Sequence, residues 1–374
     1  MIREEVFLAF CGVRPSRMLL PNLHYININF NCRFFHPQTP QLLFGPTLTS
    51  LHIEIDYPGT CTASQLVPLT SSILHNSPNI QHFTLSSYSC PSTEVESFAF
   101  GLISNSHNLQ TISLPELQLT RETIAHLARL PSLTVLKSVL IPRSDVGLFP
   151  VGVFPYLKTF SVELDDWESA ITILDSLSCA FESFTVRCYA VLEPLSMLQD
   201  FMGKLALLSS SLITIDLRGD HMERFSQSNT VKSVTDLIRP LFSCNRLQVV
   251  SLTFPFLYLL EDSELEAAAL AWTLLEKLRL CGGKWGDPRA TCKGLASLLR
   301  HCPKLKKVAL HLDTRTFESS LLKGVRNASV KHLEFFHPVQ VDADRKIRAA
   351  LRGAFPGLRY LFHGTSTQIV VPKG

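Results

Sequence analysis

The chain has 374 residues, of which 46% are hydrophobic and 18% are charged, and its formal net charge is +3. A chain this rich in apolar residues buries a large core, which excludes an intrinsically disordered polyelectrolyte. The longest apolar run, Leu247 to Leu260, is interrupted by polar residues and proline. It falls short of the ~20 residues that a membrane-spanning helix needs.

The N-terminus and the cysteines indicate the cellular compartment. Glu4 and Glu5 stand where a signal peptide carries only positive charge, and no small-residue cleavage site follows them. The 10 cysteines include no C-x-x-C pair, in a chain too long to need disulfide staples. These features favour reduced, mostly buried thiols over a disulfide framework or a zinc site, and we expect a cytoplasmic or nuclear protein.

Along the chain, an apolar spacing of three and then two residues recurs, as in Leu109-x-x-Ile112-x-Leu114. Successive copies begin between 24 residues (Leu109 to Leu133) and 35 residues (Leu212 to Leu247) apart, which suits the longer leucine-rich repeats. The first positions of the copies are Leu23, Leu48, Ile80, Leu109, Leu133, Leu157, Phe181, Leu212, Leu247, Leu275, Leu305, Val330 and Leu358.

The spacing predicts a short strand in every copy. The last two apolar positions lie two residues apart, so their side chains share one face of a strand, while the first position faces inward from the turn before it. Proline stands just before several copies, where it ends a helix and opens a turn. These prolines are Pro78, Pro131, Pro155, Pro303 and Pro356.

Helix-start signals lie between the predicted strands. Thr93-x-x-Glu96 and Ser263-x-x-Glu266 are typical of capping boxes, in which two side chains satisfy the first backbone N–H groups. Asp287-Pro288 is typical of an N-cap followed by proline at the first helical position, and Thr120 precedes apolar residues at helical spacing. Each repeat is therefore predicted to contain a strand, a loop, a helix and a turn.

A strand and helix of ~28 residues cannot cover their own apolar face, so neighbouring repeats stack and share one core. The predicted fold class is an α/β leucine-rich-repeat solenoid, a horseshoe with a parallel inner sheet, outer helices and about 13 repeats. Residues 21–374 are expected to form the solenoid, and residues 1–20 a capping helix or a partial repeat. The alternative, two ordinary α/β domains with similar strands, does not explain the aligned helix signals.

Several segments resemble the leucine-rich-repeat region of fungal F-box proteins of the basidiomycete type. They are "LLPNLHYININF" (19–30), "LLFGPTLTSLHIEI" (42–55), "ILHNSPNIQHFTL" (73–85) and "LLRHCPKLKKVALHL" (298–312). In that family an N-terminal F-box docks on a Skp-type adaptor of a cullin ubiquitin ligase, and the repeats capture the substrate. The F-box, which usually opens with a Leu-Pro-x-Glu phrase, is not visible before Leu23.

The resemblance implies an intracellular protein that recognises substrates for an SCF-type ubiquitin ligase. A Skp-type adaptor is expected as a partner only if an F-box is supplied. The alternative is a free-standing leucine-rich-repeat scaffold with no ubiquitin role.

The sequence carries no enzyme signature. It lacks the G-x-S-x-G, H-E-x-x-H, Walker A and dinucleotide-binding glycine motifs. The segment "CGGKWGDP" (281–288) has no Ser or Thr beside its lysine, so it is interpreted as a turn and not a phosphate loop. Asp165-Asp166 is interpreted as a helix N-cap and not a paired carboxylate site, and His301 as a positive charge at a helix C-terminus. We expect neither an enzyme nor a cofactor or metal.

The predicted partner-binding surface is the solvent face of the inner sheet, made by side chains that lie between the apolar positions. Its earlier strands carry small, mostly neutral side chains, and its later strands carry basic ones. The predicted binding residues are His52, His82, Thr84, Thr111, Ser113, Thr159, Ser161, Thr185, Asp216, Lys277, Arg279 and Lys307.

Charge is distributed unevenly along the chain. Residues 273–374 contain 19 Lys+Arg and 7 Asp+Glu, whereas residues 1–272 contain 16 and 25. A basic end attracts acidic partners, so the sequence predicts a protein partner that is acidic or phosphorylated. A merely solvated basic face is the alternative. Nucleic acid is disfavoured because few aromatic residues are interleaved with the basic ones, and no membrane partner is expected.

Overall fold

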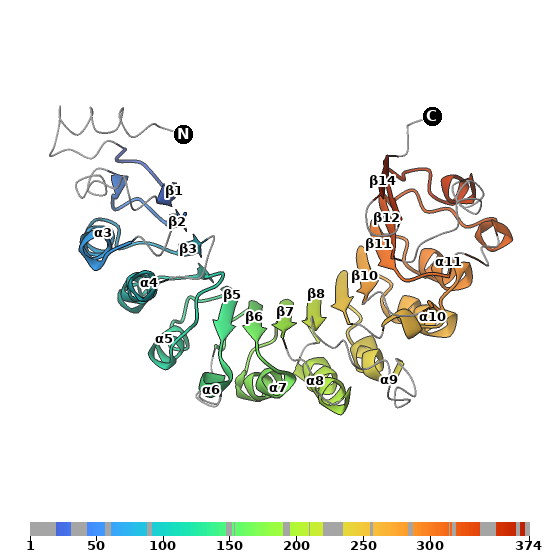
Figure 1. Cartoon of the computed structure of the whole chain (residues 1–374), viewed down its shortest axis with the longest axis horizontal. Coiled ribbons are helices and arrows are strands. Elements are labelled where there is room, and N and C mark those ends of the chain that lie inside the picture. The colour runs from blue at the N-terminus through green and yellow to red at the C-terminus, as the bar shows by residue number, and fades with distance from the viewer. Residues whose placement is uncertain are drawn as a thin grey trace. The chain divides into compact units, whose positions relative to one another are not determined.

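The structure of the chain is a computed structural model in which strands and helices alternate (Figure 1). It describes residues 20–30, 43–56, 61–87, 92–146, 152, 154–189, 195–208, 210–219, 235–254, 257–282, 287–313, 315, 319–336, 349–363 and 367–370. Residues 1–19 lie outside this set, so the expected N-terminal cap over residues 1–20 stays a prediction.

The chain forms two compact units, which are described separately. The first comprises Met1–Glu163 with Asp175–Cys179, and the second comprises Leu164–Leu174 with Ala180–Gly374. The first unit contains the strands β1 (Tyr25–Phe30), β2 (Ser50–Ile55), β3 (His82–Ser87), β4 (Thr111–Ser113), β5 (Val135–Ile141) and most of β6 (Thr159–Leu164). Its helices are α3 (Ala63–Asn76), α4 (Thr93–Asn105), α5 (Arg121–Leu127) and α6 (Arg143–Val146).

The second unit repeats the same arrangement. Its strands are β7 (Ser183–Cys188), β8 (Thr214–Gly219), β9 (Val249–Thr253), β10 (Lys277–Cys281), β11 (Lys307–Leu310), β12 (His332–Phe335), β13 (Tyr360–His363) and β14 (Thr367–Val370). Its α-helices are most of α7 (Trp167–Ser176), α8 (Leu195–Leu208), α9 (Thr235–Ile238), α10 (Asp262–Ala271) and α11 (Cys292–His301). Short 3-10 helices add η3 (Arg239–Ser243), η4 (Leu257–Leu259) and η5 (Ser319–Leu322).

The strands of each unit pair in chain order, and the helices lie on one side of them (Figure 1). In the first unit, β1 to β5 pair in parallel. In the second unit, β7 to β13 pair in parallel. The predicted fold, a leucine-rich-repeat α/β solenoid with a parallel sheet and helices on the other side, is confirmed. The antiparallel strand β14, which pairs with β13, was not predicted.

Among the described residues, the thirteen strands from β1 to β13 each begin two residues after the first apolar position of a sequence copy. Thr111 of β4, for example, follows Leu109, and Lys307 of β11 follows Leu305. From the second copy on, the apolar positions are buried, with at most 8% of any side chain exposed, the largest fraction being that of Leu358. Stacked copies therefore supply the core, as the spacing predicts.

Strand β5 departs from the spacing because of a local change in its backbone. Ser138 has a positive φ of 53°, in the left-handed region that few residues other than glycine adopt. The strand resumes one residue out of step, so that Val139 and Ile141 are fully buried. This explains why the copy that begins at Leu133 has no apolar residue at its third position.

Two helix starts follow the sequence signals. The Thr120 hydroxyl oxygen accepts a hydrogen bond from the Thr123 N–H at 3.3 Å and caps α5. The Asp166 carboxylate accepts one from the Ser169 N–H at 2.7 Å, which confirms that Asp165-Asp166 supplies an N-cap. His301 is the last residue of α11, the position that the sequence predicts for it.

Three other helix starts were predicted a few residues too late or too early. The N-cap of α4 is Ser92 and not Thr93. Helix α10 begins two residues earlier than predicted, because Glu264 accepts a hydrogen bond from the Glu261 N–H at 2.7 Å. Helix α11 is capped by Thr291, well after Asp287-Pro288. Nearby polar residues compete for these positions, and tertiary contacts decide between them.

The expectation of reduced cysteines is wrong at one position. Cys61 is disulfide-bonded, although its neighbours in the sequence include no second cysteine at short spacing. Sequence spacing cannot show which cysteines the fold brings together. Among the described residues, the cysteines that form no disulfide are all buried, and they are Cys179, Cys188, Cys244, Cys281, Cys292 and Cys302.

Candidate functional site

The residues that alternate with the buried apolar ones along each strand form the sheet face opposite the helices, which we call the open face. The alternation is clear in β2, β6 and β7, where every second residue is buried. All twelve predicted binding residues lie on this face, and each is half-buried or exposed. Their role in binding remains a prediction.

In the first unit the open face is polar and mostly neutral. His52, Thr84 and Ser113 are register partners on three adjacent strands, and His82 faces Thr111 one row away. The predicted residues Thr159 and Ser161 lie on β6. This part of the face offers hydrogen-bonding groups but little charge.

In the second unit the open face becomes basic. Lys277, Lys307 and His332 occupy equivalent places on β10, β11 and β12, where Lys277 faces Lys307 and Lys307 faces His332. We call these three residues the basic row. Adjacent strands are ~4.8 Å apart, so the two lysines present like charges side by side. Among the described residues, neither lysine has an ion-pair partner.

Two other predicted binding residues form ion pairs within the protein. Arg279 forms an ion pair with Glu334, with its Nη1 3.2 Å from the carboxylate oxygen, and its guanidinium lies over the Phe336 ring at 5.2 Å. Asp216 forms a two-pronged ion pair with Arg218 of the same strand, at 3.1 and 3.2 Å. The charges of Arg279 and Asp216 are therefore balanced by partners that the sequence analysis did not identify.

Sequence reasoning missed His332 of the basic row and its neighbour Tyr360 on β13. The two rings stack with their centroids 4.7 Å apart and their planes 15° from parallel. Tyr360 faces His332 in the strand register. Both occupy the place in their copies that Lys277 and Lys307 occupy in theirs, so the repeat spacing could have identified them.

The environment of His332 disfavours a positive charge on its ring. Burial lowers the pKa of His332 below its ordinary value, and the nearby charges of Lys307, Arg359 and Lys331 lower it further. Its Nδ1 atom is buried and has no hydrogen-bond partner among the described residues. The imidazole therefore stays neutral where it adjoins several permanent cations.

A second set of cations flanks the basic row just before the strands begin. Lys331 and Arg359 are exposed. Lys306 is also exposed but binds Glu276, with its Nζ 2.6 Å from the carboxylate oxygen. This second set adds positive potential to the β10–β13 region, because only one of its lysines is neutralised by a neighbouring acid.

In the described part of the chain, no group of three or more His, Cys, Asp or Glu side chains is placed to hold a metal ion. Burial raises the pKa of the Cys179 thiol to about 12 and that of Cys302 to about 11. Thiols with such high pKa values carry almost no thiolate at neutral pH and are poor nucleophiles.

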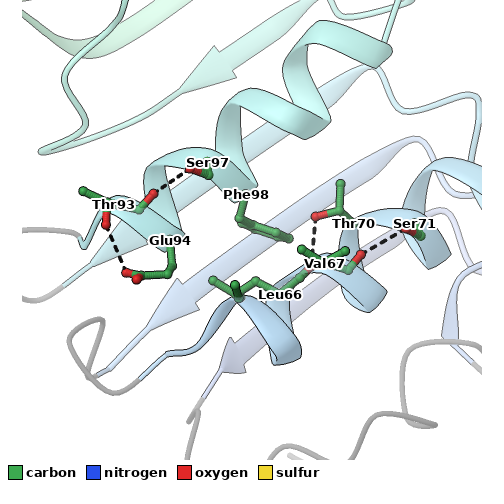
Figure 2. Close-up of a pocket in the computed structure, with 9 residues that line it drawn as sticks. Leu66, Val67, Thr70, Ser71, Thr93, Glu94, Ser97 and Phe98 are labelled. Carbon is green, nitrogen blue, oxygen red and sulfur yellow. Dashed lines mark hydrogen bonds between the residues drawn. The ribbon is translucent and has the colours of Figure 1, made fainter.

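A groove of about 350 Å³ lies between α3 and α4 on the helix side of the first unit (Figure 2). Leu66, Val67 and Phe98 line it. Its hydroxyl groups are occupied by their own helices, since Thr70 donates to the Leu66 carbonyl at 2.9 Å and Ser97 donates to the Thr93 carbonyl at 2.8 Å. The groove has no converging polar groups of the kind that orient a small-molecule ligand.

Known proteins resemble this chain in structure. No family model and no curated protein matches the sequence. A chain of the yeast Rad7 and Elc1 complex is similar over 99% of this chain and 86% of its own, at 12% identity and a TM-score of 0.53. The leucine-rich repeat-containing protein LegL7 of Legionella pneumophila matches 88% of this chain and 100% of its own, at 14% identity and a TM-score of 0.42.

The internalin InlF of Listeria monocytogenes matches 93% of this chain and 82% of its own, at 12% identity and a TM-score of 0.40. The likeness to the yeast complex shows a shared fold. In the described residues, no helix has the length and apolar character required to span a bilayer.

Proposed function

We propose that the chain is a non-enzymatic protein-interaction solenoid that holds a partner on its open face. The observation that carries the proposal is the basic row, in which two like charges lie on adjacent strands without an ion-pair partner among the described residues. Like charges placed opposite each other on a sheet destabilise it, so a stable fold tolerates them best where a ligand supplies the opposite charge. An acidic or phosphorylated protein segment supplies that charge.

The proposal is tested by reversing charge on the open face. In the Lys277→Glu/Lys307→Glu variant, we expect at least a tenfold loss of partner affinity and a flatter dependence of affinity on salt, because the reversed charges repel an acidic segment. The matched control is Lys293→Glu/Lys323→Glu, which makes the same charge change at exposed positions in α11 and just after η5. Equal affinity of both variants and the wild type, measured by titration calorimetry, would place the partner elsewhere.

We further propose that this interaction serves substrate recognition by a ubiquitin ligase, as the resemblance to fungal F-box proteins implies. The fold is shared with a chain of the Rad7 and Elc1 complex, a yeast protein that is itself bound to a partner. The competing candidate is a leucine-rich-repeat scaffold with no ubiquitin role. Co-purification of the chain with a recombinant Skp-type adaptor separates the two. Stoichiometric binding of the adaptor supports ligase function, and partner binding without it supports the scaffold.

A further inference from the structure

The basic row carries positive charge that its neighbours in the described residues do not neutralise. Two acidic residues close to the basic row in the sequence are already paired, because Glu276 binds Lys306 and Glu334 binds Arg279. The side chain between Arg279 and Glu334 in the register is the small, buried Ala309, which lets the two charged groups meet across β11. The fold therefore neutralises one row of the sheet and leaves the adjacent row positive.

His332 is the third member of the basic row, and it offers a hydrogen-bonding ring whose orientation is restricted by its neighbours. Its ring stacks on Tyr360, and Lys307 lies opposite it on the neighbouring strand β11. Its Nδ1 is buried without a hydrogen-bond partner among the described residues, and such atoms are rare in folded proteins because each costs free energy. A neutral imidazole beside three cations gains a proton readily once an anion offsets the surrounding charge.

We propose that the basic row binds the phosphate group of a phosphorylated protein partner. The inference rests on the proposed function and names the chemistry that the open face recognises. A phosphate monoester carries nearly two negative charges and three strong acceptor oxygens, which matches two ammonium groups and one imidazole on adjacent strands. Lysine is a compact point charge that suits phosphate, whereas the two-pronged geometry of arginine suits a carboxylate. Arg279, on the open face of β10, is already bound to Glu334.

The same surface is poorly suited to single-stranded nucleic acid. Binding of that kind needs aromatic rings on which successive bases stack, alongside a track of cations. The two rings nearest to the basic row are already covered on one face, since His332 stacks on Tyr360 and the Arg279 guanidinium lies over Phe336. A single phosphate group fits the short row of cations better than a chain of nucleotides does.

The first test uses the full chain and phosphoserine as the probe, observed through the histidine ring signals in NMR spectra. The His332 signal is assigned with the His332→Gln variant. We expect phosphoserine to shift this signal with saturable, millimolar affinity, and we expect Lys277→Gln/Lys307→Gln to weaken binding at least tenfold. The control Lys293→Gln/Lys323→Gln should bind as the wild type does. No shift of His332, or an equal shift with glutamate at the same concentration, would overturn the inference.

The second test separates this inference from the proposed function. An immobilised peptide library is made in matched serine, phosphoserine and glutamate forms, with oligothymidine as a further probe. Binding confined to phosphoserine peptides and lost in Lys277→Gln/Lys307→Gln supports the inference.

Equal binding of the serine and phosphoserine forms leaves the proposed function standing and overturns the phosphate site. Oligothymidine binding that is as tight as peptide binding overturns it too. A shift of His332 by free phosphoserine, with no peptide bound, supports the anion site and counts against a protein partner.

Discussion

His332 shows how a side chain acquires its chemistry from neighbours that are distant in the sequence. Lys307 lies on the strand before it and Arg359 just before the strand after it, and both repel a proton from its ring. Tyr360 stacks on that ring and restricts its orientation. A lone histidine between Lys331 and Leu333 is by itself uninformative, and only the strand register gives it a role.

We predict that His332 titrates below the ordinary pKa of histidine in the free protein, and that Lys307→Gln raises its pKa. The reason is the removal of a nearby positive charge that disfavours the protonated ring. Sulfate should raise the same pKa in the wild type, because a bound dianion favours the charged imidazole. A pH titration of the histidine ring signals measures each shift. The control Lys323→Gln, at an exposed site not among the charges that shift His332, should leave the pKa unchanged.

The effect of a bound anion on the pKa of His332 sets the pH dependence of anion binding. Because the bound anion raises the pKa of His332, binding takes up protons between the lowered pKa of the free protein and the higher pKa of the complex. The affinity for sulfate should therefore rise as the pH falls through that interval. Phosphoserine loses its second charge near pH ~6, so its affinity should rise less steeply. An affinity for sulfate that is flat with pH would show that His332 does not take part.

At the scale of single elements, the strands were predictable and the helix starts were less so. Three buried residues fix the register of each strand, since a shift by one residue would turn its core face to solvent. A helix start can be supplied by any of several nearby polar residues, as at Glu261, where a glutamate serves as the cap in place of Ser263. The backbone shift at Ser138 also had no sequence signal beyond the missing apolar residue of its copy.

The candidate site was also predictable only in part. The periodic pattern placed Lys277 and Lys307 on the open face, because alternate residues of a strand face opposite sides. It could not show that Arg279 is neutralised, since its partner Glu334 lies 55 residues away in the sequence. The same pattern would have found His332 if each copy had been compared position by position and not by charge alone.

Helices α10 and α11 are joined by one carboxylate. Asp262, the first residue of α10, accepts hydrogen bonds from the Thr291 N–H at 2.7 Å, the Thr291 hydroxyl at 2.6 Å and the Gly294 N–H at 2.9 Å. Gly294 allows this approach, because a Cβ there would lie 2.7 Å from the Asp262 carboxylate oxygen. One helix therefore caps the N-terminus of the next.

We predict that Asp262→Ala lowers the free energy of unfolding by about 1–3 kcal/mol, because it leaves partly buried N–H groups without an acceptor. Asp262→Asn retains one acceptor oxygen and should lose less. Urea unfolding, followed by circular dichroism, gives both values. The matched control is Asp236→Ala at the exposed start of α9, where the carboxylate makes only a 3.9 Å ion pair with Arg239. An Asp262→Ala variant as stable as this control would contradict the role given to the carboxylate.

At the scale of the whole molecule, a repeat protein is held together by contacts between neighbouring coils, so a local defect should have a local effect. Gly357 in the turn before β13 is a suitable site. A Cβ at this position would lie 2.2 Å from the Ala328 carbonyl oxygen in the turn before β12, a distance that no ordinary contact allows. The backbones of two adjacent coils approach each other closely at this glycine.

We predict that Gly357→Ala destabilises the coils of β12 and β13 by about 1–3 kcal/mol, as a steric clash in a packed region does. Amide hydrogen exchange should accelerate in these strands, while β2 and β3 keep the protection of the wild type. The control is Gly353→Ala in the helical residues 349–354, where an added Cβ meets no atom within 4 Å and should be neutral or stabilising. Uniform acceleration of exchange in β2, β3, β12 and β13 would instead mean that the coils unfold as a single cooperative unit.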